Sequence, residues 1–258
     1  MKTPETILDL HGIVVGSVDV GERDKLLTVL TAERGLLTVY ASGARRIKSR
    51  LLALSELFTY SRLLISERGD RLYLKDGDVS HNFYELRTSL ERAALASYVC
   101  EVVSYTGTEQ ADPELLRLVL NTLYAVSEGL YPIPHIKAAF EFRYAAHLGF
   151  MPDVGGCAIC GGGGETVLQI ALGQVVCDGC RGTASLTEYE GEETAIALLS
   201  EGARAAIGYV VSAPVQKIFS FRLEGDDLRL FSGAAEEYLL YHTDHLYSTL
   251  TFYKQVVD

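Results

Sequence analysis

Four of the five cysteines fall into two pairs with the same spacing. Two residues separate the members of each pair and sixteen residues lie between the pairs: Cys157, Cys160, Cys177 and Cys180. A two-residue gap lets both thiolates of a pair face one ion from a tight turn, and neighbouring glycines let backbone N–H groups approach the sulfurs. Two such pairs complete a closed tetrahedral shell, so the spacing predicts one structural zinc ion per chain, without a catalytic role.

Other chemistries of paired cysteines fit this sequence less well. Two disulfides would suit an exported protein, but the chain begins without an apolar signal segment. A thioredoxin-like site needs one pair at the start of a helix and leaves the second pair unexplained. A nucleobase deaminase needs an H-x-E segment, and no histidine here is followed two positions later by Glu. Cys100 lies within a helical pattern and is expected to be a small buried hydrophobe.

The second cluster able to do chemistry is positively charged. Residues 42–50 read SGARRIKSR and hold four cations within six positions: Arg45, Arg46, Lys48 and Arg50. The chain carries a net charge of −11, but residues 1–80 hold 12 Lys and Arg against 11 Asp and Glu, so the acidity lies in the later part. The surroundings are therefore nearly neutral. We interpret the cluster as a nucleic-acid contact, extended by Lys25 and Arg34, with a surface that only favours solubility as the alternative.

The elements that must position this cluster are strands. Five β-rich runs separated by turn signals occupy residues 7–80, which predicts a small closed barrel of the OB type. The gap at residues 44–56 holds the cations and has room for a short helix. Such barrels bind single strands by combining cations with aromatic stacking. Four aromatic residues are available either for stacking or for the core: Tyr40, Phe58, Tyr60 and Tyr73.

After residue 80 the apolar period changes to that of helices. Asp112 and Pro113 predict a helix start and Gly129 its end, and a third helix is expected to end at Gly149. Helical patterns return over roughly 188–210 and 233–256. We therefore predict an α+β protein, with a barrel domain at 1–80 and a helical domain at 81–258 that carries a zinc-binding insertion at 155–186. No apolar run approaches the ~18–20 residues needed to span a bilayer, so we expect a cytoplasmic protein without a membrane partner.

The sequence carries no recognisable catalytic motif. A phosphate-binding GxxxxGK[ST] loop, a G-x-S-x-G elbow and an H-E-x-x-H pair are all absent. A DNA-binding protein is the interpretation that the barrel and the cations favour. Two others stay open: a protein–protein adaptor, suggested by the acidic helical majority, and an enzyme acting on nucleic acid, suggested only by the cysteine pairs.

Taken in order, these elements resemble the RecO family of bacterial DNA repair proteins. The resemblance rests on GIVVGSVDVGERDKLLTVLTAERGLLTVYASGARRIKSRL, then on FEFRYAAHLGFMPDVGGCAICG and VVCDGC, and on a C-terminal helix after a break. Within the first passage, the G-E-x-D turn, the L-T-x-E-x-G hairpin and the G-A-R-R-x-K-S-R run look like the family pattern. The match spans nearly the whole chain.

The resemblance implies an N-terminal OB-fold, a helical domain with an inserted zinc module, and a non-enzymatic role in recombinational repair. Members bind single- and double-stranded DNA, anneal complementary strands and, with RecR, help RecA displace single-strand-binding protein. It implies DNA contacts by Arg45, Arg46, Lys48 and Arg50, metal ligation by the four paired cysteines, and association with the nucleoid. Many relatives carry a basic segment in the last helix, where this chain has HTDHLYS at 242–248, so the N-terminal barrel should bear more of the DNA contact.

Overall fold

The computed structural model describes residues 6–164, 166–183, 188–189, 192–193 and 195–257. The chain divides into two compact units, one formed by residues 1–128 with 247–258 and the other by residues 129–246. Each unit is described by itself below. None of the described helices carries an apolar stretch of the length that crossing a bilayer requires.

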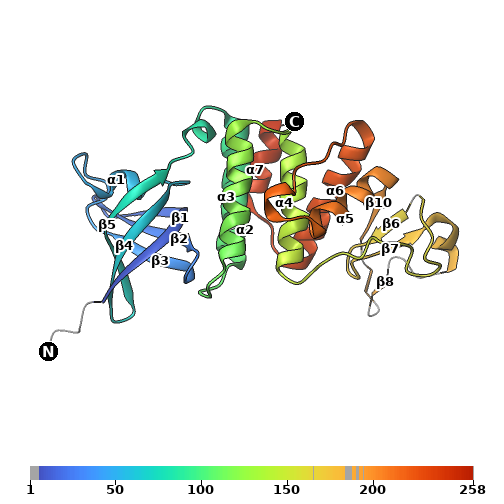
Figure 1. Cartoon of the computed structure of the whole chain (residues 1–258), viewed down its shortest axis with the longest axis horizontal. Helices are drawn as coiled ribbons and strands as arrows, with labels where there is room; N and C mark the ends of the chain where they lie inside the picture. Colours follow the sequence, from blue (N-terminus) through green and yellow to red (C-terminus); the bar gives the residue numbers. More distant parts are fainter. Residues whose placement is uncertain (1–5, 165, 184–187, 190–191, 194, 258) are drawn as a thin grey trace. The chain divides into compact units, whose positions relative to one another are not determined.

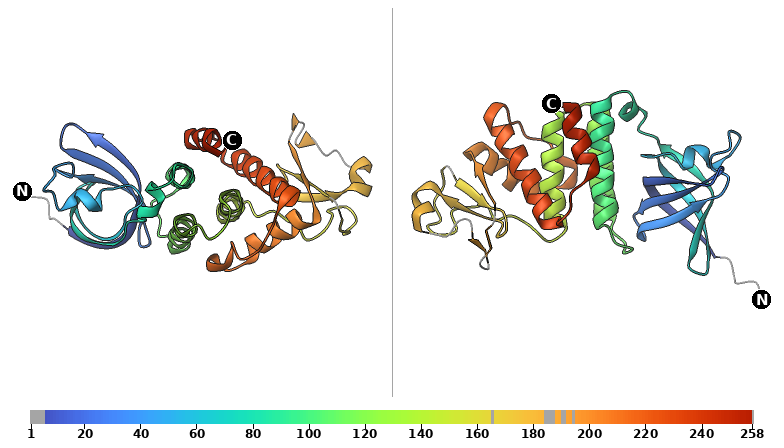
Figure 2. Two further views of the ribbon diagram at one scale, coloured as in Figure 1. Left: turned by 90° about the horizontal axis from the view of Figure 1, so that it is seen from above. Right: turned by 180° about the vertical axis from the view of Figure 1, so that it is seen from behind.

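The first unit contains a closed five-stranded barrel, which confirms the predicted OB-fold (Figure 1). Its strands pair in the order β1-β2-β3-β5-β4, and Figure 2 shows them curving round to close the barrel. β1 is long enough to pair with β2 along its second half and with β4 along its first half. The strands are β1 (Thr6–Val20), β2 (Asp24–Thr31), β3 (Gly35–Ala41), β4 (Tyr60–Arg68) and β5 (Arg71–His81).

Alternation along each strand separates the barrel's core from its surface. In β3, Leu37, Val39 and Ala41 are buried, whereas Thr38 is exposed and Tyr40 is half-buried. Successive strand residues point to opposite faces, so this pattern alone places one face inward. The core also takes in residues beyond β3, from the loop at Ala44 and from the short helix α1 (Leu51–Leu54) that was expected in the gap.

Three helices and a short 3₁₀ turn complete the first unit (Figure 1). The helix that was predicted to begin near Asp112 does so: the Asp112 carboxylate accepts a hydrogen bond from the Leu115 N–H at 2.9 Å. Gly129, with a φ of +63°, follows the end of that helix, as predicted. The elements are η1 (Tyr84–Arg87), α2 (Leu90–Thr106), α3 (Pro113–Glu128) and α7 (Ser248–Val257).

The second unit combines helices with a small antiparallel sheet of order β10-β6-β7. Its helix α4 packs against α6, where the Phe142 and Tyr238 rings lie 5.7 Å apart. The elements are α4 (Ile133–His147), β6 (Thr166–Gln169), β7 (Gln174–Cys177), η2 (Asp178–Thr183), β8 (Glu188–Tyr189), β9 (Glu192–Glu193), β10 (Ile196–Leu199), α5 (Glu201–Ser212), η3 (Val215–Lys217) and α6 (Gly225–Thr243).

Two predicted helical stretches were wrong in extent. The pattern at 188–210 becomes helical only at Glu201, because residues 196–199 pair with β6 and the Ser200 hydroxyl caps the new helix by accepting from the Ala203 N–H. The pattern at 233–256 forms two helices, since Asp244 adopts a φ of +46° that ends α6 before α7 begins. Strand pairing divides the first pattern and a left-handed residue divides the second, although each pattern looked continuous in the sequence.

Glu101 ties the C-terminal helix α7 to helix α2 within the first unit. Its carboxylate, on α2, accepts hydrogen bonds from the backbone N–H groups of Ser248 at 3.2 Å and Thr249 at 2.8 Å, and from both hydroxyls. These groups lie at the start of α7, where backbone donors lack partners within the helix. Partial burial raises the pKa of Glu101, but the hydrogen bonds from Thr249 and Ser248 outweigh it and leave the pKa below its usual range.

Replacing the Glu101 carboxylate with an amide (E101Q) should lower the free energy of unfolding by about 1–2 kcal/mol at pH 7, since charged acceptors make the stronger hydrogen bonds. Because the folded-state pKa is lowered, the carboxylate's contribution is present above its unfolded pKa of about 4.3 and is lost as pH falls through the folded value. Urea unfolding against pH measures this difference. Glu109, exposed in a loop, supplies the control E109Q; equal losses in both variants would contradict the capping role.

Candidate functional site

The four paired cysteines converge on one point in the second unit. Their sulfur atoms all lie within 4.8 Å of one another, and the sulfurs of Cys160 and Cys177 are 3.7 Å apart. A tetrahedral zinc ion with Zn–S bonds of ~2.3 Å requires sulfurs about 3.8 Å apart. The separation is much longer than a disulfide bond of ~2.05 Å. The predicted set therefore forms a cluster that could hold a metal ion.

Two tight turns position these sulfurs. In the first, the Cys157 N–H donates to the Gly162 carbonyl at 2.9 Å and the Gly161 N–H donates back to the Cys157 carbonyl at 2.8 Å. Gly161 has a φ of +72°, which favours glycine. Backbone N–H groups then reach the sulfurs, from Ile159 to Cys157 and from Gly162 to Cys160, both at 3.4 Å. The glycines thus serve the role that the sequence suggested for them.

The cluster is electrostatically suited to a cation. Backbone N–H groups of Cys177 and Cys160 lower the pKa of the Cys157 thiol to about 6. In contrast, the neighbouring thiols of Cys160 and Cys177 raise the pKa of Cys180 to about 12. One thiolate therefore forms easily, while further negative charge at the same point is unfavourable. A divalent cation at the centre would offset that repulsion.

The basic segment is held out from the barrel by two buried ends. We call residues 42–50 the basic loop. Ala44 is fully buried in the barrel core and Leu51, directly after the loop, is buried with 8% exposure, whereas the residues between them are largely exposed. Ile47, in the middle of the cations, is 92% exposed. The chain therefore cannot withdraw the loop into the core without losing both anchors.

A single carboxylate fixes the start of the basic loop. Asp24, at the first residue of β2, accepts hydrogen bonds from the Tyr40 phenol and, at 2.6 Å, from the Gly43 N–H. The Tyr40 and Gly43 bonds hold the pKa of Asp24 below its usual range. Gly43 has a φ of +70°, a conformation that L side chains rarely adopt. The Arg45 N–H also donates to the Arg23 carbonyl at 3.0 Å, so the β1–β2 turn supports the loop twice.

Of the six predicted DNA-contacting cations, three form ion pairs with described carboxylates, namely Arg45, Lys25 and Arg34, and three do not. Arg45 forms an ion pair with Asp19 at 3.0 Å, and Lys25, whose side chain is only 14% exposed, forms one with Glu56 at 2.9 Å. Arg46, Lys48 and Arg50 are exposed and form no ion pair with a described carboxylate. Lys48 and Arg50 thus keep their charge available to a ligand, and Arg46 does so too, although its charge also helps to lower the pKa of Asp24.

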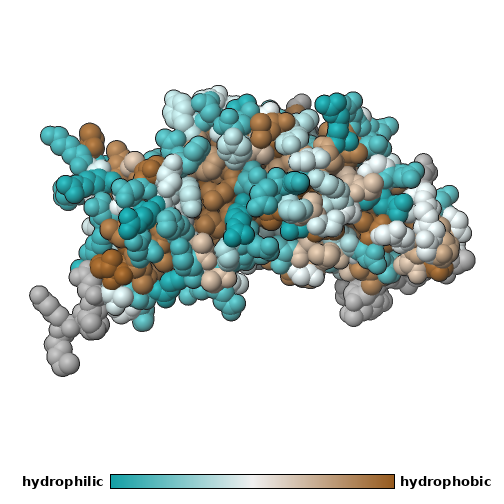
Figure 3. Space-filling model, viewed as in Figure 1, coloured by the Kyte–Doolittle hydropathy of each residue, from teal (hydrophilic) through white to brown (hydrophobic). Residues whose placement is uncertain are grey.

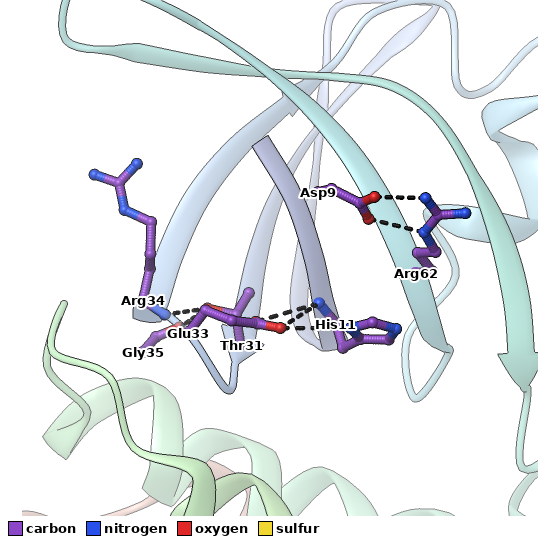
Figure 4. A network of polar contacts seen from close by, with 7 residues as sticks. All are labelled: Asp9, His11, Thr31, Glu33, Arg34, Gly35 and Arg62. Carbon is purple, nitrogen blue, oxygen red and sulfur yellow. Dashed lines mark hydrogen bonds and ion pairs between the residues drawn. The ribbon is translucent and has the colours of Figure 1, made fainter. Parts of the chain in front are cut away.

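Arg34 lies at the far end of β3 from the basic loop. It belongs to the β2–β3 hairpin, where the Arg34 N–H donates to the Thr31 hydroxyl and Glu33 accepts from the His11 N–H (Figure 4). Its guanidinium points away from this network and pairs with Glu67 at 3.4 Å. β3 spans seven residues, or roughly 23 Å. The structure therefore does not bring Arg34 together with the basic loop.

The four candidate aromatic residues differ in whether they lie in the core or on the surface of the barrel. Phe58 is buried and belongs to the core. Burial and the charge of Glu33 raise the pKa of Tyr60, which lies at the start of β4. Tyr40 and Tyr73 are neighbours on the outer side of the barrel, with ring centroids 5.8 Å apart. Only these two are positioned together on the surface.

Sequence reasoning missed the acids that organise this region. Asp19, Asp24 and Glu56 decide which cations are paired and where the loop lies. One signal was present, because Asp24 is the last residue of the G-E-x-D turn. The other two acids carry no motif, and their roles follow from tertiary contacts alone.

Comparison with known proteins covers both parts of the chain. Residues 6–83 match the sequence profile of the family described as recombination protein O N terminal, and residues 87–249 match recombination protein O C terminal. The chain is 30% identical to the DNA repair protein RecO of Acetivibrio thermocellus over 248 residues, which is 96% of each chain. It is 36% identical to that of Myxococcus xanthus over 208 residues, covering 77% of this chain and 84% of the relative.

Removing the Asp24 charge (D24N) should loosen the basic loop, because an amide oxygen accepts more weakly from the Gly43 N–H and the Tyr40 phenol. Hydrogen exchange at neutral pH should become faster at residues 42–46. In the unmodified protein the same loosening should appear on acidification, as pH falls through the lowered pKa of Asp24.

Asp78, whose side chain is 84% exposed, supplies the matched control D78N. In D78N, the hydrogen-exchange rates of residues 42–46 should equal those of the unmodified protein. Unchanged protection of the Gly43 N–H in D24N would show that the carboxylate does not hold the loop.

Proposed function

This chain belongs to the RecO family of DNA repair proteins, and from that premise we propose that it binds DNA through its basic loop. The observation that carries the proposal is the group of three exposed cations that form no ion pair with a described carboxylate, Arg46, Lys48 and Arg50, between two buried anchors. Phosphate contacts need cations whose charge is not already neutralised. Arg45 and Lys25, which pair with acids, would support the loop rather than supply free charge.

We propose further that the protein is a non-catalytic recombination mediator. In this role it would bind single- and double-stranded DNA, anneal complementary strands and, with RecR, promote loading of RecA onto strands coated by single-strand-binding protein. Figure 3 shows hydrophilic residues interspersed with apolar ones over the barrel. Because the whole chain is acidic, a nucleic acid should meet it only where positive charge is concentrated.

For the cysteine cluster we propose one structural zinc ion. All four ligand positions would be filled by sulfur, which leaves no open position for a substrate or water. The described buried residues that pack with Cys157 are Val167 and Val176, so the face of the sheet toward the cysteines has little apolar core of its own. Metal ligation would then supply the stability that burial does not.

The basic loop is tested by removing its free cations together (R46A/K48A/R50A). Affinity for a single-stranded oligonucleotide should fall, and the slope of log K against log salt should become shallower by about 2, since each lost contact changes it by about 0.7. Fluorescence anisotropy over a salt series measures both quantities.

A control with the same change in net charge removes three exposed cations of the second unit, Lys217, Arg222 and Arg229. It should retain the affinity and the slope of the unmodified protein. If the loop variant behaved like this control, the loop would not be the DNA contact. Tight binding of RecR without DNA affinity at physiological salt would instead favour the adaptor function.

The metal is tested by elemental analysis of the purified protein, which should find one zinc per chain. Cys157→Ser and Cys177→Ser should each release it, because each removes one of four ligands. Cys100→Ser is the matched control: this cysteine is buried in α2, where burial raises its pKa, and it should leave the zinc in place. Full retention of zinc by both ligand variants would exclude the four-sulfur site.

A further inference from the structure

A groove of about 530 Å³ lies on the outer face of the barrel, across β2, β3 and β5. Leu26, Tyr40 and Tyr73 form a row along the groove, because strand register places Leu26 beside Tyr40 and Tyr40 beside Tyr73. Arg71 and Asp70, from the β4–β5 hairpin, lie at its edge. Its volume is within the range of small-ligand pockets.

The side chains in this row are not needed for the barrel core. Their strand neighbours Leu27, Val39 and Leu74 are the ones that point inward and are buried. Leu26 remains 37% exposed although it is a large apolar residue, and the two tyrosine rings meet edge to face at an interplanar angle of 73°. An apolar, aromatic row on an outward face is available to a flat ligand.

The groove lies near the start of the basic loop. Tyr40 lies two residues before the loop, and its phenol donates to the same Asp24 carboxylate that accepts from the Gly43 N–H. Positive charge is also present, since the Arg68 guanidinium lies over one face of the Tyr73 ring, with its carbon 5.8 Å from the ring centre, and Arg71 is part of the wall. The other face of the ring is the one that a base would use. The acids beside the groove are Asp70 on this wall and Asp24 at the Tyr40 hydroxyl, so the two cations are matched by two acids.

We propose that this groove receives an unpaired nucleobase of single-stranded DNA, stacked on Tyr73, while the neighbouring basic loop holds the backbone. The proposal rests on the proposed DNA-binding function and adds the strand preference. A base inside a duplex already has both faces stacked, so only an unpaired base could use the ring. Tyr40 acts as a wall whose position is fixed by its bond to Asp24, which leaves Tyr73 as the main stacking surface.

The test compares two strands that carry the same phosphates, oligothymidylate and an abasic oligonucleotide of equal length. Tyr73→Ala should weaken oligothymidylate binding about 5- to 150-fold, the range for losing one base stack, with an unchanged salt slope. On the abasic strand the variant and the unmodified protein should bind equally. Tyr73→Phe should bind both strands like the unmodified protein, since stacking needs the ring and not the hydroxyl.

Tyr84, 64% exposed and outside the barrel strands, supplies the control Tyr84→Ala, which should change neither affinity. A loss for Tyr73→Ala that is equal on both strands would mean a structural role and would overturn the stacking site. If Tyr73→Ala bound oligothymidylate with the affinity of the unmodified protein while the basic-loop variant bound it more weakly, the stacking site alone would be overturned. If instead the basic-loop variant kept its DNA affinity while Tyr73→Ala lost affinity only for the strand with bases, the loop contact would be overturned and the stacking site retained.

Discussion

The carboxylate of Asp24 is the constraint on which both surface features of the barrel depend. It joins the turn between β1 and β2 to the end of β3 by accepting from Tyr40 and from the Gly43 backbone. The same two bonds set the direction in which the basic loop leaves the barrel and the position of one wall of the groove. A short side chain at the start of a strand therefore places a charged segment and an aromatic surface next to each other.

The acidic residues of the barrel give identical cations different roles. Arg45 and Arg46 are adjacent in sequence, yet one is paired with Asp19 and the other has no described carboxylate partner at ion-pair distance. An exposed ion pair contributes little stability, but it restricts a long side chain and neutralises its field. Pairing thus concentrates the free positive charge of this region at the tip of the loop, between residues 46 and 50.

The cysteine cluster lies on a face of the small sheet that has little apolar core to stabilise it. A small sheet and two glycine-rich turns bring four sulfurs together, with only a few buried aliphatic side chains beside them. Several thiolates at one point repel each other, so the arrangement is favourable only with a compensating cation. The helical part of the same unit needs no such centre, because α4 and α6 bury aromatic rings against each other.

The sequence by itself determined the features that depend on local spacing. Alternation over residues 7–80 indicated a closed five-stranded barrel, and the two-residue gaps between Cys157 and Cys160 and between Cys177 and Cys180 indicated one cluster. Tertiary structure alone decided which cations stay unpaired and which tyrosines meet, because those outcomes depend on partners such as Asp19 and Glu56 that carry no local signal. It also decided where helix α5 begins, since pairing of residues 196–199 with a distant strand overrode a helical pattern. Periodicity is a property of neighbours along the chain, whereas pairing is a property of neighbours in space.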